Sequence, residues 1–210
     1  CEWAGSKDGT RRGPRVRPHH FMTMKPTLDA SHIYRLDGRA RDSVSRVLDL
    51  FFPPTPFYTE EGRDLGTVRH LWFHALVRGQ VMENEPDPRI GGAVIGFRKF
   101  MADVQPLYVT GEESFHDPVL DVCGTPDLVA EIGGRLAVVD YKPPTKNKRT
   151  LVQTAAYSLM LRANRFPILD RYELRLGNGI YRLDKHRDAD DEKRWPVMVA
   201  AFRAASHYRG

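Results

Sequence analysis

One stretch near the centre of the chain, GTPDLVAEIGGRLAVVDYKP at residues 124–143, constrains the fold more than any other. Two apolar runs flank Gly133 and Gly134, and glycine readily adopts the positive φ that a two-residue hairpin turn requires. The stretch therefore predicts two antiparallel strands joined by a tight turn. Because both runs are apolar at successive positions, they are typical of central strands that are covered on both faces.

These two strands nevertheless carry charge. Pairing outward from the turn places Asp127 opposite Asp140 and Thr125 opposite Lys142, all on one face. Directly paired side chains have Cβ atoms about 4.5–5.5 Å apart, and two carboxylates that close repel unless one is protonated or a cation lies between them. A surface cluster of salt bridges is the simpler interpretation, but the apolar neighbours disfavour it. We therefore expect a divalent cation with oxygen ligands, Mg²⁺ or Mn²⁺.

The rest of the chain alternates between helical and strand patterns. A short strand, a turn at Asp37-Gly38 and a helix capped by Ser43 come first, and the prolines of FFPPTPFY end that helix. The segment ENEPDPRIGG is predicted to be a loop. We expect helices over 60–81, AVIGFRKFMADV, 149–163 and 191–208, and strands over 107–116, 122–132, 135–141, 171–176 and 179–183, the last two around a GNG turn. This order predicts an α/β (α+β) fold, a central mixed β-sheet flanked by helices, with residues 22–210 as a single domain.

Charge is concentrated at the N-terminus. The chain has a net charge of +5, of which residues 1–21 contribute +3, so residues 22–210 carry only +2 and charge alone does not indicate a nucleic-acid partner. Residues 1–21 lack periodicity and are expected to be a disordered basic tail, or to precede a natural start at Met22 or Met24. Neither a signal peptide nor a run of about 18 apolar residues is found, so we expect no membrane association and a reducing, cytoplasmic location.

An ordered series of motifs resembles the PD-(D/E)XK nuclease superfamily, in its RecB-like and phage-exonuclease-like branch. Each motif alone is common, whereas their order and spacing together are specific, and the resemblance spans roughly residues 33–205. The motifs are DSVSRVL at 42–48, GTVRH at 66–70, GEESFHDP at 111–118, GTPD at 124–127, DYK at 140–142 and QTAAY at 153–157.

The resemblance implies a restriction-endonuclease-like core and a role for each matched residue. Lys142 would be the catalytic lysine, acting with Asp127, Asp140, Gln153 and Tyr157, and Glu112 is favoured over Glu113 as the upstream ligand. Just after the motif, Lys146, Lys148 and Arg149 are candidate contacts to DNA phosphates. The implied metal ligands are His70, Glu112, Asp127, Asp140 and the main-chain carbonyl of Tyr141.

Other interpretations stay open for several of these residues. His70 could be a core histidine, or could bind zinc together with His74 one turn later, although no third soft ligand is evident. Gln153 and Tyr157 could merely pack, and the basic residues after the motif could be a solvated loop. Cys123 is expected to be a small buried hydrophobe. The chain has only two cysteines, so we expect none of the iron–sulfur clusters found in some relatives.

The resemblance therefore predicts a metal-dependent DNA nuclease of a bacterial or phage-infected cell, most simply an exonuclease acting in recombination, repair or phage genome processing. A structure-specific or nicking endonuclease and a non-catalytic DNA-binding member of the fold are the alternatives. DNA is the expected partner. A single-strand annealing or recombination protein is a further candidate, and some relatives form rings, so an oligomer is an option.

Overall fold

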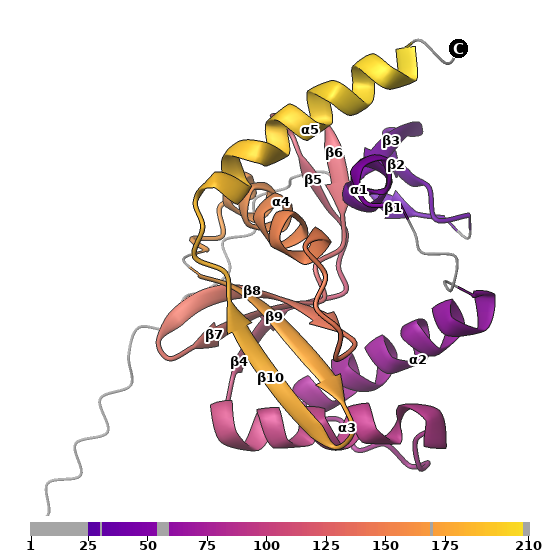
Figure 1. Cartoon of the computed structure of the whole chain (residues 1–210), viewed down its shortest axis with the longest axis vertical. Helices are drawn as coiled ribbons and strands as arrows, with labels where there is room; N and C mark the ends of the chain where they lie inside the picture. The colour runs from indigo at the N-terminus through magenta and orange to yellow at the C-terminus, as the bar shows by residue number, and fades with distance from the viewer. Residues whose placement is uncertain (1–24, 30, 54–58, 169, 208–210) are drawn as a thin grey trace, which may run out of the picture.

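The computed structural model describes residues 25–29, 31–53, 59–168 and 170–207. The expectations for the tail at 1–21 and for most of PPTPFY lie outside these ranges. The described residues form an α+β fold in which mixed sheets are flanked by helices (Figure 1). No helix of this part of the chain is long and apolar enough to cross a membrane.

The larger sheet carries the hairpin that the sequence predicts. Leu128 pairs with Val139 and Ile132 with Arg135, which is the predicted register, and Gly133 and Gly134 turn with φ of +56° and +75°. The strand that follows β8 runs parallel to it, and the sheet is therefore mixed. Its order is β10-β9-β8-β7-β4, with β4 at Leu107–Thr110, β7 at Leu128–Ile132, β8 at Arg135–Lys142, β9 at Asp170–Gly177 and β10 at Ile180–Lys185.

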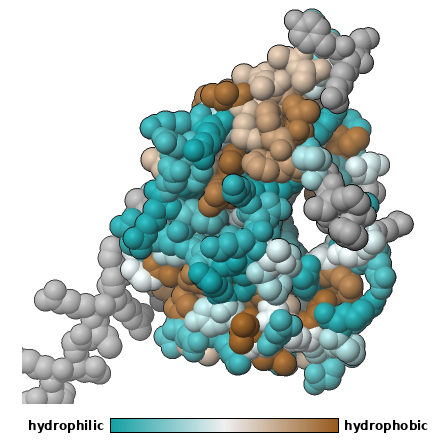
Figure 2. All heavy atoms as spheres, viewed as in Figure 1, coloured by the Kyte–Doolittle hydropathy of each residue, from teal (hydrophilic) through white to brown (hydrophobic). Residues whose placement is uncertain are grey.

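Helices cover both faces of this sheet, which explains why β7 and β8 are apolar at successive positions. Val129 and Val138 pack against one layer of helices, while Leu128 and Val139 point to the other. The first layer contains α1 (Val44–Phe51), α4 (Arg149–Ala163) and α5 (Asp190–His207); the second contains α2 (Glu60–Val77) and α3 (Pro88–Val104). Figure 1 shows α5 lying along the outer side of α4, and Figure 2 shows hydrophilic residues over the middle of the same view.

A second, smaller sheet lies beside α1. It has the order β1-β2-β3-β6-β5, and the predicted turn residues Asp37 and Gly38, which have positive φ, join β2 to β3, a strand that was not predicted. Ser43 ends β3 and caps α1, because its side chain accepts a hydrogen bond from the Arg46 N–H at 3.0 Å. The strands are β1 Thr27–Leu28, β2 Tyr34–Leu36, β3 Arg39–Ser43, β5 Phe115–Asp117 and β6 Val122–Gly124.

Two long predicted strands are each broken in two. The expected strand at 107–116 is β4 and β5, and the expected strand at 122–132 is β6 and β7. Glu112 has a φ of +54°, which an extended strand does not allow, and Pro126 lacks the N–H that a ladder needs. The chain therefore crosses from one sheet to the other at both points.

The predicted loop ENEPDPRIGG was wrong in its second half. Asp87 caps α3 by accepting from the Arg89 N–H at 2.9 Å, and the helix begins at Pro88. Of the two glycines in this segment, Gly92 serves close packing, because a Cβ there would lie 3.1 Å from the Asn178 nitrogen of the β9–β10 turn. The other helix and strand predictions agree with the structure to within a few residues at their ends.

Candidate metal centre and its surroundings

The two crossings between the sheets hold two of the predicted carboxylates side by side. Asp127 comes directly before β7, and its Oδ2 accepts a hydrogen bond from the Tyr141 N–H at 2.6 Å. The Glu112 N–H donates to the carbonyl of Pro126 at 3.0 Å. Gly111 permits this contact, because a Cβ there would lie 2.5 Å from the Asp127 carbonyl oxygen. The strand breaks that the sequence did not predict therefore bring Glu112 to Asp127.

His70 reaches the same point from α2. Its Nδ1 lies 3.0 Å from Glu112 Oε1 and 3.4 Å from Asp127 Oδ1. One ligand atom from each of these three residues lies within 4.8 Å of the others, close enough to hold one cation. Burial lowers the pKa of His70, but the charge of Asp127 and the hydrogen bond that the ring donates to Glu112 outweigh this and raise it to about 9. The two carboxylates thus attract positive charge to this position.

Asp140 lies next to this trio, fully buried in β8. Its Oδ2 forms an ion pair with Lys142 Nζ at 2.5 Å, and its Oδ1 is buried without a hydrogen-bond partner among the described residues. Burial raises the pKa of Asp140 to about 6 against the opposing charge of Lys142, and the charge of Asp127 adds to the rise. Burial also raises the pKa of Asp127, although His70 and Lys142 oppose it. Two neighbouring buried carboxylates with raised pKa values fit a hard divalent cation.

Alternation along β8 explains how helices from opposite faces reach one site. Tyr141 points toward α2 and α3, where its ring meets that of His70 with centroids 5.7 Å apart. Asp140 and Lys142 point to the α4 face, as Val138 does. Asp127 comes directly before β7, so its carboxylate is accessible from both faces of the sheet. The site therefore lies at the end of the strands, where both helix layers are accessible.

Gln153 and Tyr157 approach from α4. Gln153 Nε2 lies 3.3 Å from the Tyr157 hydroxyl, and Gln153 Oε1 is buried without a partner. Burial raises the pKa of Tyr157 well above its usual value, and the charges of Asp140 and Asp127 add to this shift. The Tyr157 ring also packs on Gly124, where a Cβ would lie 2.8 Å from it. Tyr157 therefore lies near the acidic residues and also packs in the core, so the two predicted interpretations are compatible.

The basic residues after the motif separate into two kinds. Lys146 and Lys148 are exposed. Arg149 instead binds α1: its guanidinium lies 2.5 Å from Asp49 Oδ1 and donates to the carbonyls of Phe52 and Ser45. The prediction that Arg149 contacts DNA is therefore disfavoured, because its donors are already used within the fold.

The remaining alternatives can be compared with the geometry. His74 Nε2 lies 3.3 Å from an Arg78 nitrogen and away from the trio, which disfavours a zinc site with His70. Glu113 pairs with Lys25 at 2.8 Å, so Glu112 is the glutamate beside His70. Cys123 is buried, as predicted. The main-chain carbonyl of Tyr141 as a ligand stays a prediction.

Sequence reasoning missed a row of charges that extends from the site across the sheet. Asp140 is paired in register with Glu173 on β9, and Glu173 with Asp184 on β10. In the same way Lys142 is paired with Arg175, whose guanidinium contacts Asp184. The α4 crossover connects β8 to β9, so no tight turn fixes the register of these two strands.

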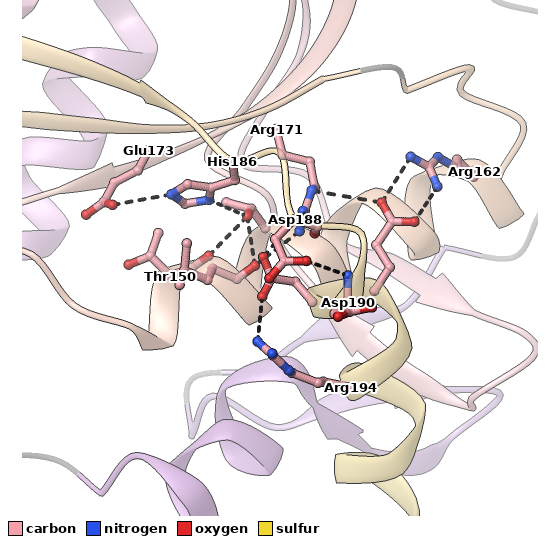
Figure 3. Close-up of polar contacts among 12 residues, drawn as sticks. Thr150, Arg162, Arg171, Glu173, His186, Asp188, Asp190 and Arg194 are labelled. Atoms are coloured by element: carbon pink, nitrogen blue, oxygen red, sulfur yellow. Dashed lines mark hydrogen bonds and ion pairs between the residues drawn. The ribbon is translucent and has the colours of Figure 1, made fainter.

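Glu173 joins the row to a buried polar network, shown in Figure 3. His186 lies 3.5 Å from Glu173 Oε2 and 3.0 Å from Thr154 Oγ1. Arg171 donates to the carbonyl of Asp188 at 2.6 Å and contacts Asp191 at 3.4 Å. This network holds the beginning of α5 against β9 and α4.

Comparisons with known proteins show the family to which the chain belongs. The model of the PD-(D/E)XK nuclease superfamily matches residues 35–208. The chain therefore belongs to this superfamily and is a nuclease. Among solved structures, an alkaline exonuclease from Laribacter hongkongensis is similar, with a TM-score of 0.46 and 13% sequence identity over 80% of this chain and 89% of that one. No curated protein sequence matches.

Proposed function

We propose that this nuclease is a metal-dependent deoxyribonuclease of the RecB-like and phage-exonuclease-like branch that hydrolyses DNA from its ends. The observation that carries the proposal is the group formed by His70, Glu112 and Asp127, with ligand atoms within 4.8 Å of one another, beside the buried carboxylate of Asp140. These donors suit Mg²⁺, with Mn²⁺ as a substitute. Residues 22–210 would form one catalytic domain.

Each residue of the site has a role that follows from its position. His70, Glu112, Asp127 and Asp140 would hold the metal, which supplies an activated water and screens the charge on the phosphate. Lys142 keeps its positive charge, because Asp140 and Asp127 raise its pKa against the effect of burial. Its ammonium group would stabilise the negative charge that develops on the phosphate.

The remaining proposed roles belong to α4 and the loop before it. Gln153 has a buried oxygen free to accept a hydrogen bond from Lys142 or from a bound water, and its amide nitrogen lies beside Tyr157. Lys146 and Lys148 are exposed in the loop that follows β8, so they would contact DNA phosphates without reading sequence.

The test is a cleavage assay on end-labelled linear DNA and on closed circular DNA of the same sequence, with Mg²⁺, Mn²⁺ or EDTA. An exonuclease shortens the linear DNA only, and EDTA stops it. Circles cut as fast as linear DNA would support the endonuclease alternative. Tight DNA binding without cleavage under any metal would support the non-catalytic one.

A further inference from the structure

The candidate ligands Glu112 and Asp127 lie on two separate crossing segments, and a chain of three hydroxyl groups joins these segments to β2. The Thr125 Oγ1 atom lies 2.9 Å from the Tyr34 hydroxyl and 3.2 Å from the Ser114 hydroxyl. Thr125 can donate to one of these groups and accept from the other, so a single threonine satisfies both.

Two members of this chain lie close in sequence to a candidate ligand, and the third contacts one of those two. Ser114 comes two residues after Glu112, and Thr125 two residues before Asp127. Tyr34 is buried, with 8% of its surface exposed, and it belongs to the N-terminal hairpin. Burial raises the pKa of Tyr34 against the effect of its Thr125 hydrogen bond, and the charges of Cys123 and Glu112 contribute further. The phenol therefore stays neutral.

The crossings need such support. Glu112 is held at a φ of +54°, which a non-glycine residue adopts only when its surroundings enforce it. Between the paired strands on either side, the main chain supplies one direct bond from segment to segment, from the Glu112 N–H to the Pro126 carbonyl. The hydroxyl chain supplies a further link, between Ser114 and Thr125.

We propose that Tyr34, Thr125 and Ser114 are positioning residues that hold Glu112 and Asp127 at the separation a divalent cation requires. This inference rests on the proposed metal site and assigns it a support that comes from the N-terminal hairpin. Groups that orient metal ligands in this way typically change metal affinity by about 10–100-fold when removed.

The test measures binding of Mn²⁺ alone to the full chain by calorimetry, without DNA, together with the thermal midpoint of each variant. Tyr34→Phe and Thr125→Val each remove one hydroxyl and keep the shape, and we expect Mn²⁺ affinity to fall about tenfold or more. Thr125→Ser keeps the hydroxyl and should retain the wild-type affinity. Tyr181→Phe is the matched control, because it removes a tyrosine hydroxyl that bonds Asp103 on α3, away from the site.

The outcomes are distinguishable. Wild-type Mn²⁺ affinity in Tyr34→Phe and Thr125→Val overturns the inference, whatever their thermal midpoints, and so does an equal loss in Thr125→Ser or Tyr181→Phe. If the wild-type chain itself fails to bind Mn²⁺, the proposed metal site falls and the positioning role with it. If the wild type binds Mn²⁺ but cuts no DNA, only the proposed activity fails.

Discussion

At the scale of single residues, Asp127 is the point where both halves of the candidate site meet. Its Oδ1 lies 3.4 Å from His70 Nδ1, and its Oδ2 accepts from the Tyr141 N–H. One oxygen of the carboxylate thus makes a structural hydrogen bond to the main chain, while the other faces His70, where its negative charge matters. A substitution that removes only the charge can separate the two.

We expect Asp127→Asn to remove cleavage and to leave the fold intact. An amide oxygen still accepts from the Tyr141 N–H, while the buried negative charge that would hold the metal is lost. The expected loss of rate is about 10²–10³-fold or more, and Lys142→Ala should lose a similar factor because charge on the phosphate is no longer stabilised. Cleavage rate and circular dichroism of each variant check this, and full activity in either would contradict the site assignment.

Arg149 and Lys146 are near each other in sequence but differ in their contacts: Arg149 is bonded within the fold, whereas Lys146 is exposed. Arg149→Ala removes the contacts to Asp49 and to two carbonyls of α1, and we expect it to lower the free energy of unfolding by about 1–3 kcal/mol. Lys146→Ala should leave stability unchanged and reduce the salt dependence of DNA binding by about one phosphate contact. Urea unfolding and DNA binding at several salt concentrations distinguish them; equal stability of both variants would count against this division.

At the scale of elements, α3 depends on glycine to approach the β9–β10 hairpin. A Cβ on Gly96 would lie 2.8 Å from the Ile180 carbonyl carbon and closer still to its oxygen. Because main chain cannot move aside as a side chain can, Gly96→Ala should destabilise the fold by about 1–3 kcal/mol or more. Gly91 in the same helix has open space around it, so Gly91→Ala should be neutral or stabilising by about 0.5–1 kcal/mol. Thermal unfolding of the pair checks this, and a Gly96→Ala variant as stable as Gly91→Ala would contradict the packing.

The same scale shows what sequence can predict. The 133–134 turn fixes the register of β7 and β8 locally, because two glycines leave one tight pairing, and the structure has that pairing. Local signals did mark the two breaks, because the apolar pattern stops at GEES and at GTPD, where Gly111 and Pro126 are poor strand residues. What the sequence could not show is that the chain passes to a second sheet at each break, because only tertiary contacts determine that. Short motifs in the sequence indicate His70 and Asp140 as candidate site residues. No local signal indicates Glu173, because it lies beside Asp140 only through the parallel pairing of β8 with β9.

At the scale of the whole molecule, the candidate site joins elements that are otherwise separate. His70 comes from α2, Asp140 from the larger sheet, and Asp127 and Glu112 from the two crossings between the sheets. A cation bound by all of them would link α2 to the larger sheet and to both crossings between the sheets. Metal binding should therefore stabilise the fold as a whole, since ligands bound only by the native state raise its stability.

We expect Mn²⁺ at about one hundred times its dissociation constant to add about 2.7 kcal/mol of stability, which corresponds to a rise of about 5–10 °C in Tm for a domain of this size. Asp127→Asn should lose most of that rise, because the charge that attracts the cation is gone. Its metal-free Tm should equal or exceed that of the wild type, since burial disfavours the ionised carboxylate. Scanning calorimetry in EDTA and in Mn²⁺ measures both quantities. An equal Mn²⁺-dependent rise in wild type and variant would place the bound ion away from Asp127, and the crossings would then be a structural junction without a metal.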